Sequence, residues 1–177
     1  LIFEIISNRK IAKNTYECVL SGDITDIKCG QFVNITVDGQ YLRRPISVCD
    51  AEDGRLTLIY KVVGVGTEKM ANMTKGTRLD LLTGLGNGYD VSKSGDKPLL
   101  IGGGAGVPPM YKLCRALVRE GKSPSVILGY GSADEVFYEE EFKALGCQVT
   151  VTTVDGSRGI KGFVTDALKK MDYTYFY

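Results

Sequence analysis

The chain has 177 residues and carries 22 Lys and Arg against 21 Asp and Glu, which leaves a formal net charge of +1. This balance, without any extended basic run, argues against nucleic acid and membranes as partners. Hydrophobic residues make up 44% of the composition, and no apolar run approaches the roughly 18 residues needed to span a bilayer. The sequence therefore predicts a cytoplasmic globular protein with one large or two small domains.

Histidine is absent, and five cysteines are spread along the chain without a Cys-x-x-Cys pair. The lack of histidine excludes Ser-His-Asp and Cys-His catalysis and removes the commonest ligand of catalytic zinc. Scattered cysteines in an odd number are typical of reduced thiols. We therefore expect no metal site in this chain and a chemistry that depends on a bound cofactor.

The first half of the chain contains short β-type segments separated by Gly, Asp and Asn turns. Their spacing predicts a small antiparallel barrel or sandwich. One helix, over residues 67–75, is expected to interrupt the series. The expected strands cover residues 3–10, 15–20, 31–38, 46–50, 55–63 and 77–82.

Two motifs in this half are candidates for phosphate binding. In RRPIS, residues 43–47, an arginine before a proline-stiffened strand can hold a phosphate, while Ser47 offers a hydroxyl to a ring heteroatom. In GVGT, residues 64–67, Gly66 and Thr67 are placed to donate to a phosphate at a helix start. The alternatives are exposed arginines beside an edge-strand proline and a simple N-cap at Thr67.

The second half alternates between strands and helices, which is typical of a parallel sheet with helices on its faces. The change of pattern falls at residues 91–98. Strands are expected over residues 98–103, 125–131, 148–154 and 173–177, and helices over residues 107–121, 134–146 and 162–171.

The run IGGGAGVPPM, residues 101–110, lies between the first parallel strand and its helix. Nucleotide phosphates bind at this position in such sheets, because free backbone N–H groups and the positive end of the helix dipole point into the crevice. Pro108 and Pro109 suit the first helical turn, where a missing N–H costs no hydrogen bond. The spacing differs from G-x-G-x-x-G, so a tight turn without a ligand is an equally good interpretation of this run alone.

The end of the second parallel strand bears on which dinucleotide would bind. The run LGYGSADE, residues 128–135, contains acids but no Lys or Arg, whereas a 2′-phosphate favours a cation there. This difference favours NAD over NADP. The alternative is that Asp134 and Glu135 only begin a helix, where acidic residues are favoured in any case.

The motifs RRPIS, GVGT, GLGNGYD, IGGGAGVPP, DEVFYEEEF and DGSRGIKGFVTDAL, in this order, resemble those of the electron-transfer subunits of dihydroorotate dehydrogenase B, a family within the ferredoxin-NADP reductase superfamily. The resemblance covers essentially the whole chain. It implies an antiparallel six-stranded FAD-binding β-barrel over residues 1–92 and a Rossmann-like NAD-binding α/β domain over residues 93–177. It also implies electron transfer in pyrimidine biosynthesis, from a partner FMN-containing catalytic subunit in a hetero-tetramer, through an iron–sulfur cluster and FAD, to NAD.

The resemblance also implies which residues bind the cofactors, and it identifies no catalytic residue in this chain. Those implied for FAD are Arg44, Pro45, Ile46, Ser47, Ile59, Tyr60, Lys61, Gly66 and Thr67. Those implied for NAD are Gly102, Gly103, Gly104, Ala105 and Gly106. Hydride transfer between a nicotinamide stacked over a flavin asks the protein mainly for orientation, which is compatible with the absence of histidine.

The chain departs from this family's pattern at its end. Members continue beyond a strand like YTYFY, residues 173–177, into a Cys-Gly-Pro segment and a cysteine-rich [2Fe-2S] region, so we expect the NAD-binding domain to be truncated and the cluster to lie outside this chain. Two other functions fit the same motifs. One is a reductase subunit of a ferredoxin- or sulfide-linked complex, and the other is a nucleotide-binding assembly module without redox turnover.

Overall fold

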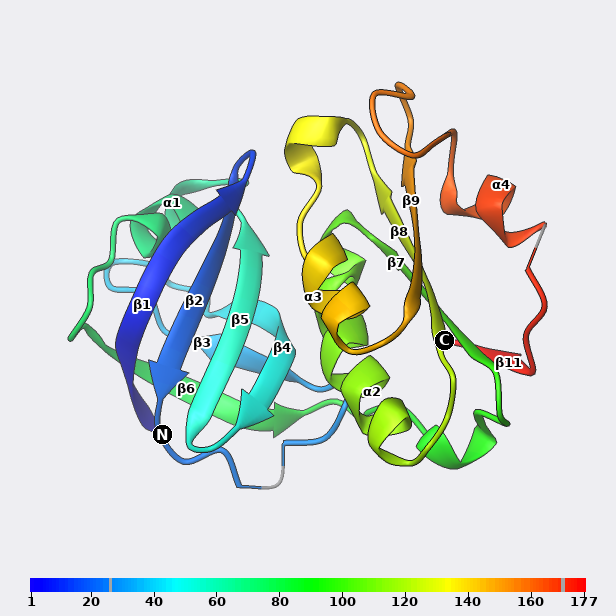
Figure 1. Ribbon diagram of the computed structural model, residues 1–177. Coiled ribbons are helices and arrows are strands. Elements are labelled where there is room, and N and C mark those ends of the chain that lie inside the picture. The colour runs from blue at the N-terminus through cyan, green and yellow to red at the C-terminus, as the bar shows by residue number, and fades with distance from the viewer. Residues whose placement is uncertain (26, 170) are drawn as a thin grey trace. The chain divides into compact units, whose positions relative to one another are not determined.

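The computed structural model describes residues 1–25, 27–169 and 171–177, and the chain divides into two compact units, Leu1–Gly88 and Tyr89–Tyr177 (Figure 1). Each unit has its own sheet. The boundary expected between residues 92 and 93 falls in a short 3-10 turn, η1 (Val91–Lys93). No helix formed by the described residues is both long and apolar enough to cross a membrane.

The first unit is a closed antiparallel barrel with the strand order β1-β2-β5-β4-β3-β6. This confirms the prediction of a six-stranded barrel. A single helix, α1 (Val65–Ala71), connects β5 to β6. The strands are β1 (Ile2–Ala12), β2 (Thr15–Ser21), β3 (Phe32–Ile35), β4 (Arg44–Glu52), β5 (Arg55–Lys61) and β6 (Arg78–Leu85).

Alternation along the strands builds the barrel core. On β2 and β5, the directly paired residues Cys18 and Leu58, and likewise Leu20 and Leu56, are buried in the same cluster. Because successive side chains point to opposite faces of a strand, the residues between them face away from the core. The barrel interior is therefore filled by side chains from every strand.

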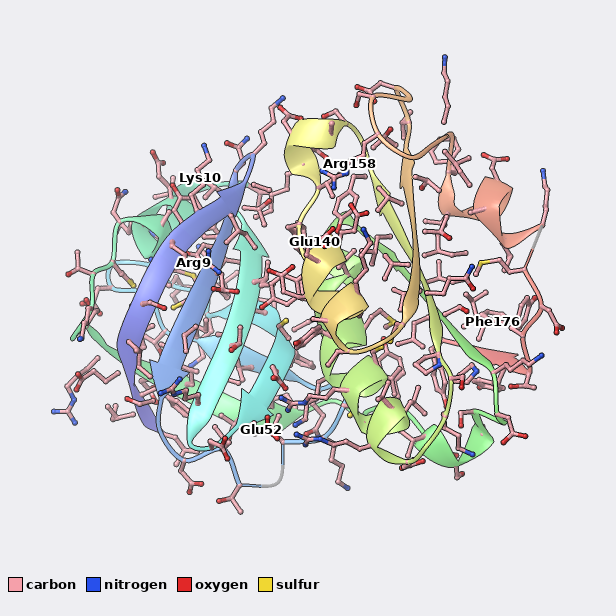
Figure 2. All side chains as sticks on the ribbon, in the orientation of Figure 1. Arg9, Lys10, Glu52, Glu140, Arg158 and Phe176 are labelled. Atoms are coloured by element: carbon pink, nitrogen blue, oxygen red, sulfur yellow. The ribbon has the colours of Figure 1, made fainter. Side chains whose placement is uncertain are left out.

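The outer surface of the barrel carries paired charges. Arg9 of β1, labelled in Figure 2, lies opposite Glu17 of β2 and forms an ion pair with it at 2.7 Å. The Arg9 side chain is 61% exposed and that of Glu17 is 10% exposed, so solvent screens the pair mainly from the side of Arg9. The stability of the barrel therefore rests mainly on its apolar interior.

The second unit is a parallel sheet, as the alternating pattern predicted, and it has five strands in the order β10-β9-β8-β7-β11. In Figure 1, α2 and α3 lie together on one face of this sheet and α4 lies on the other. The strands are β7 (Pro98–Gly103), β8 (Ser125–Tyr130), β9 (Gln148–Thr153), β10 (Ile160–Lys161) and β11 (Tyr175–Phe176). The helices are α2 (Pro108–Arg119), α3 (Glu139–Ala144) and α4 (Val164–Leu168), with 3-10 turns at η2 (Gly104–Gly106) and η3 (Ala133–Glu135).

The sequence pattern of the central strands explains why both faces are covered. Leu99 of β7 and Ile127 of β8 are fully buried in one cluster with Ala167 of α4. The next residue along each strand, Leu100 and Leu128, is also fully buried, and it lies on the opposite face because successive side chains alternate. Strands buried on both sides are characteristic of parallel sheets.

The expected helix over residues 134–146 is wrong in its extent. The chain forms the short turn η3, becomes extended at Val136, and begins α3 only at Glu139. Phe137 and Tyr138 are buried between these segments, and Tyr138 adopts a left-handed conformation with φ of 64°. Burial of the two rings interrupts the helix, which the helical propensity of the acidic run does not reveal.

The last predicted helix, residues 162–171, is also shorter in the structure. Its described part forms α4 from Val164 to Leu168, and Lys170 lies outside the described residues. The two-residue strand β10 was not predicted. Both of its residues are exposed, so no buried alternating pattern marks it in the sequence.

Candidate functional site

The two barrel motifs that were predicted to bind phosphate meet in the structure. A Cβ on Gly66 would lie 2.1 Å from Arg44 Nε, so the guanidinium lies directly over the first turn of α1. Arg44 Nη1 donates to the carbonyl of Leu42 at 2.6 Å, and Nη2 donates to Gln40 Oε1 at 2.8 Å. The N–H groups of a first helical turn have no partner within the helix. A fixed guanidinium beside them forms a suitable anion site.

The side chain of Thr67 has a local role. Its hydroxyl accepts from the N–H groups of Val63 at 3.0 Å and Gly64 at 3.3 Å, and it donates to the carbonyl of Gly64 at 3.0 Å. Thr67 is buried. Thr67 is not the N-cap, which is Gly64, but occupies the third position of α1. From there its hydroxyl organises the turn that leads into the helix, so that only its backbone N–H is left for a ligand.

The predicted site residues on β4 and β5 divide between the two faces of their strands. Tyr60 lies in the barrel core, where its hydroxyl donates to Asn8 Oδ1 at 3.0 Å and where burial raises its pKa. Ile46 also packs against the core. Ser47 and Ile59 face the other side of their strands by alternation. The side chain of Tyr60 is therefore directed into the barrel.

In the second unit, the glycine loop after β7 contains one glycine that the fold itself requires. A Cβ on Gly102 would lie 2.8 Å from the Cα of Val107 and 3.0 Å from the carbonyl oxygen of Gly106. At Gly106, by contrast, a Cβ would meet no atom within 4 Å. Gly102 therefore lets the loop fold back toward α2, whereas the backbone at Gly106 is open to a ligand.

A pocket of about 270 Å³ opens at the carboxyl ends of β7, β8 and β9. Gly103 and Gly104 of the predicted loop line it, together with Glu135, Thr152 and Phe163. The carboxyl ends of parallel strands are the usual ligand-binding edge of such sheets. The structure therefore places part of the predicted NAD loop at a pocket.

Three side chains give this pocket its chemical character. Thr152 is fully buried, and its Oγ1 has no hydrogen-bond partner among the described residues. Glu135 Oε2 accepts from the N–H of Gly131 at 3.3 Å, which directs the carboxylate to the end of β8. Phe163 is 65% exposed although it is aromatic. A buried hydroxyl without a partner carries a desolvation cost that a polar ligand group would remove.

The segment after β9 positions Phe163. Asp155 Oδ1 accepts from the N–H of Ser157 at 2.9 Å and from its hydroxyl at 2.6 Å, which closes a tight turn. Asp166 Oδ2 accepts from the N–H of Phe163 at 2.9 Å, at the start of α4. All three hydrogen bonds lie within the motif DGSRGIKGFVTDAL, so this motif shapes one wall of the pocket.

Sequence reasoning missed Thr152, Phe163 and, in the barrel, Gln40. Thr152 is near the end of a predicted parallel strand, so its place at the binding edge of the sheet was accessible in principle. Phe163 and Gln40 do not lie at the end of a predicted strand, so no comparable pattern in the sequence marks them. Each reaches its site only through the path of a connecting segment.

The cysteines do not form a cluster site. None of the five forms a disulfide, and no group of three His, Cys, Asp or Glu side chains in the described part of the chain is placed to hold a metal ion. A [2Fe-2S] cluster takes four ligands, usually thiolates. The described residues therefore provide no ligand set for one.

Comparison with known proteins agrees with the fold. Residues 100–174 match the family described as oxidoreductase NAD-binding domain. A solved structure of NADH-dependent reduced ferredoxin-NADP oxidoreductase has a TM-score of 0.85 at 31% identity and covers 96% of this chain and 63% of that chain. Phthalate dioxygenase reductase has a TM-score of 0.82 at 20% identity, covering 100% of this chain and 59% of that chain, which is a likeness of fold alone.

Two curated relatives are named dihydroorotate dehydrogenase B (NAD(+)), electron transfer subunit. The relative from Fusobacterium nucleatum subsp. nucleatum is 47% identical over 174 residues, covering 93% of this chain and 66% of the relative. The relative from Bacillus pumilus is 43% identical over 180 residues, covering 97% of this chain and 69% of the relative. This chain thus spans about two thirds of the length of these proteins.

The barrel and the parallel-sheet unit with its glycine loop define an oxidoreductase of the ferredoxin-NADP reductase superfamily, the class that joins an FAD-binding barrel to a nucleotide-binding domain. Within that superfamily, the chain belongs to the family of dihydroorotate dehydrogenase B (NAD(+)) electron transfer subunits. The predicted family resemblance is confirmed.

Proposed function

We propose that this chain binds FAD and NAD and passes electrons between them, as the electron-transfer part of an NAD-dependent dihydroorotate dehydrogenase in pyrimidine biosynthesis. The observation that carries the proposal is the presence of two separate anion-binding arrangements in one chain. One is Arg44 over the start of α1, and the other is the open glycine loop beside the pocket of the parallel sheet. The bound cofactors would supply the hydride chemistry.

The FAD site would be built around Arg44. Its guanidinium and the N–H groups of Gly66 and Thr67 would hold the pyrophosphate. Val63 is 81% exposed and Val65 is 60% exposed, and both flank the glycines, so they offer apolar surface to the rest of the ligand. The other residues that we assign to FAD are Pro45, Ile46, Ser47, Ile59, Lys61 and Tyr60, the last through its backbone.

The NAD site would extend from the segment Gly102–Gly106 into the pocket. The backbone of the loop would hold the pyrophosphate, because a Cβ-free surface lets phosphate oxygens approach the N–H groups. Phe163 would stack on a ring of the dinucleotide, and Thr152 would bond a polar group of it. Glu135 would accept hydrogen bonds from ribose hydroxyls.

The partner would be a catalytic subunit that oxidises dihydroorotate and contains FMN, in a hetero-tetramer. The names of the relatives support this, because they describe one subunit of a larger enzyme. No substrate-binding role is assigned to the residues of this chain. Electrons would reach its FAD from that partner.

A visible absorption spectrum recorded before and after anaerobic addition of NADH tests the function. We expect the purified protein to show a flavin spectrum, and we expect NADH to bleach it. A protein that retains no flavin, or a flavin spectrum that NADH leaves unchanged, would count against the proposed electron transfer. NADPH in place of NADH serves as the control for dinucleotide preference.

Replacing Glu135 with glutamine is expected to raise the KM for NADH by about tenfold, because a hydrogen bond to a charged group is worth about 1.5–3 kcal/mol. The loss of the negative charge should also reduce the discrimination against the 2′-phosphate of NADPH. The measurement is the steady-state KM of both dinucleotides with a dye as electron acceptor. Asp134→Asn is the matched control, because Asp134 is exposed and does not line the pocket. An unchanged preference in Glu135→Gln would contradict the role of Glu135.

A further inference from the structure

Two buried cysteines from distant parts of the second unit lie in direct contact. Cys114 is in α2 and Cys147 immediately precedes β9, yet their Sγ atoms are 3.0 Å apart. The two cysteines are not joined by a disulfide bond. Cys114 is fully buried, whereas Cys147 is 8% exposed. At this distance one thiol donates a hydrogen bond to the other.

Rigid elements hold the two sulfur atoms in place. Cys114 belongs to the buried face of α2, between Leu113 and Leu117. Cys147 follows Gly146, whose N–H donates to the carbonyl of Lys143 at 2.9 Å and ends α3. A disulfide bond is about 2.05 Å long, so the two sulfurs need to approach by only about 1 Å to form one.

Packing between the helices reinforces this arrangement. Tyr111 of α2 contacts Phe142 of α3 edge to face, with ring centroids 5.3 Å apart. Tyr111 also contacts Tyr138, at 5.1 Å. Aromatic contacts of this kind stabilise the pairing of the helices beyond the area they bury. The two cysteines are therefore kept side by side in the folded protein.

The electrostatic environment makes the two thiols unequal. A hydrogen bond from Cys114 lowers the pKa of Cys147, whereas that hydrogen bond and burial raise the pKa of Cys114. The thiolate is the reactive form of a cysteine. Cys147 is also the thiol with residual solvent access. It is thus suited to react first, with Cys114 as the second thiol.

We propose that Cys114 and Cys147 form a redox modification site that hydrogen peroxide converts to a disulfide. The Cys147 thiolate attacks a peroxide oxygen, the O–O bond breaks, and hydroxide leaves while Cys147 becomes a sulfenic acid. The Cys114 sulfur then attacks the sulfenic sulfur, the S–O bond breaks, and the Cys114 proton leaves with the hydroxide as water. Two thiols are oxidised, and one hydrogen peroxide is reduced to two waters.

We choose hydrogen peroxide as the oxidant because Cys147 has little solvent exposure. Cys147 as a whole residue is only 8% exposed, so a small peroxide reaches it more readily than a bulky disulfide reagent. Cys18 provides an internal comparison in the other unit, because it is buried and burial raises its pKa to about 12. We expect Cys18 to stay reduced under conditions that oxidise the pair.

The test treats the reduced full chain with hydrogen peroxide, blocks the remaining thiols by alkylation and maps the peptides by mass spectrometry. We expect a cross-linked peptide pair containing Cys114 and Cys147, lighter by two hydrogen atoms and restored by dithiothreitol, while Cys18 is alkylated. In Cys114→Ala, dimedone, which traps sulfenic acids, should label Cys147. In Cys147→Ala, Cys114 should stay unlabelled.

Absence of the cross-link in the unaltered chain, under conditions that oxidise the partly exposed Cys29, would overturn the proposal. Equal dimedone labelling of Cys114 in Cys147→Ala would overturn the assignment of Cys147 as the first thiol. The experiment on the unaltered chain tests whether the disulfide forms even if an alanine variant fails to fold. Cys29→Ser removes cross-links between molecules and leaves the pair intact.

Discussion

Replacing Arg44 with alanine is expected to weaken FAD binding by about 10- to 100-fold while the barrel stays folded. The guanidinium lies so close over the first turn of α1 that a Cβ on Gly66 would lie 2.1 Å from Arg44 Nε. A hydrogen bond between charged groups is worth about 1.5–3 kcal/mol, and the variant removes at least one from the phosphate site. The measurements are the flavin-to-protein ratio after purification and the Kd of added FAD.

The neighbouring arginine provides a matched control for this variant. Arg43 donates to Asp80 Oδ2 at 2.5 Å and to the carbonyls of Asn34 and Asp80 at 3.3 Å, and it holds the pKa of Asp80 below its ordinary value. Arg43→Ala should therefore lower the stability of the barrel without a specific loss of FAD. Equal flavin occupancy in Arg44→Ala and the unaltered chain would contradict the FAD role of Arg44.

Replacing Gly102 with alanine is expected to slow the reduction of bound FAD by NADH by at least about tenfold. The new Cβ would lie 2.8 Å from the Cα of Val107, so the backbone of the loop must move. Overpacking of this kind costs about 1–3 kcal/mol and displaces the N–H groups that would hold the pyrophosphate. Anaerobic stopped-flow absorbance follows the reduction, and thermal unfolding reports the stability.

Gly106→Ala separates the effect on the ligand from the effect on the fold. A Cβ at Gly106 meets no protein atom, so the melting temperature should stay unchanged. If NAD approaches the loop there, the KM for NADH should still rise. FAD content should be normal in both variants, because the residues that we propose for FAD belong to the other unit. Unaltered NADH reduction and stability in Gly102→Ala would show that this glycine is dispensable.

The barrel motif IYK shows that a family resemblance can name candidate residues without giving the direction of their side chains. Ile59, Tyr60 and Lys61 are consecutive, so their side chains alternate between the two faces of β5. Only the register of the barrel determines which face is inside, and it places Tyr60 in the core against Asn8. The prediction named three residues together, and the structure separates their side chains.

Local patterns in the sequence predict the order of the elements, except the short strand β10, and the location of both glycine motifs. Strand alternation, proline in a first helical turn and glycine after a strand act over a few neighbouring residues, so they can be read from the chain alone. The same reasoning placed the run 101–110 between β7 and α2. The family resemblance then indicated the cofactors that we propose for these motifs.

The contacts between distant residues depend on the folded structure. It brought Arg44 to Gly66, set Thr152 beside the glycine loop, and placed Cys114 against Cys147. These contacts depend on strand register and on the packing of helices against the sheet, and a shift of one residue would turn each side chain to another face. No local pattern encodes them, because each contact joins segments that the sequence keeps far apart.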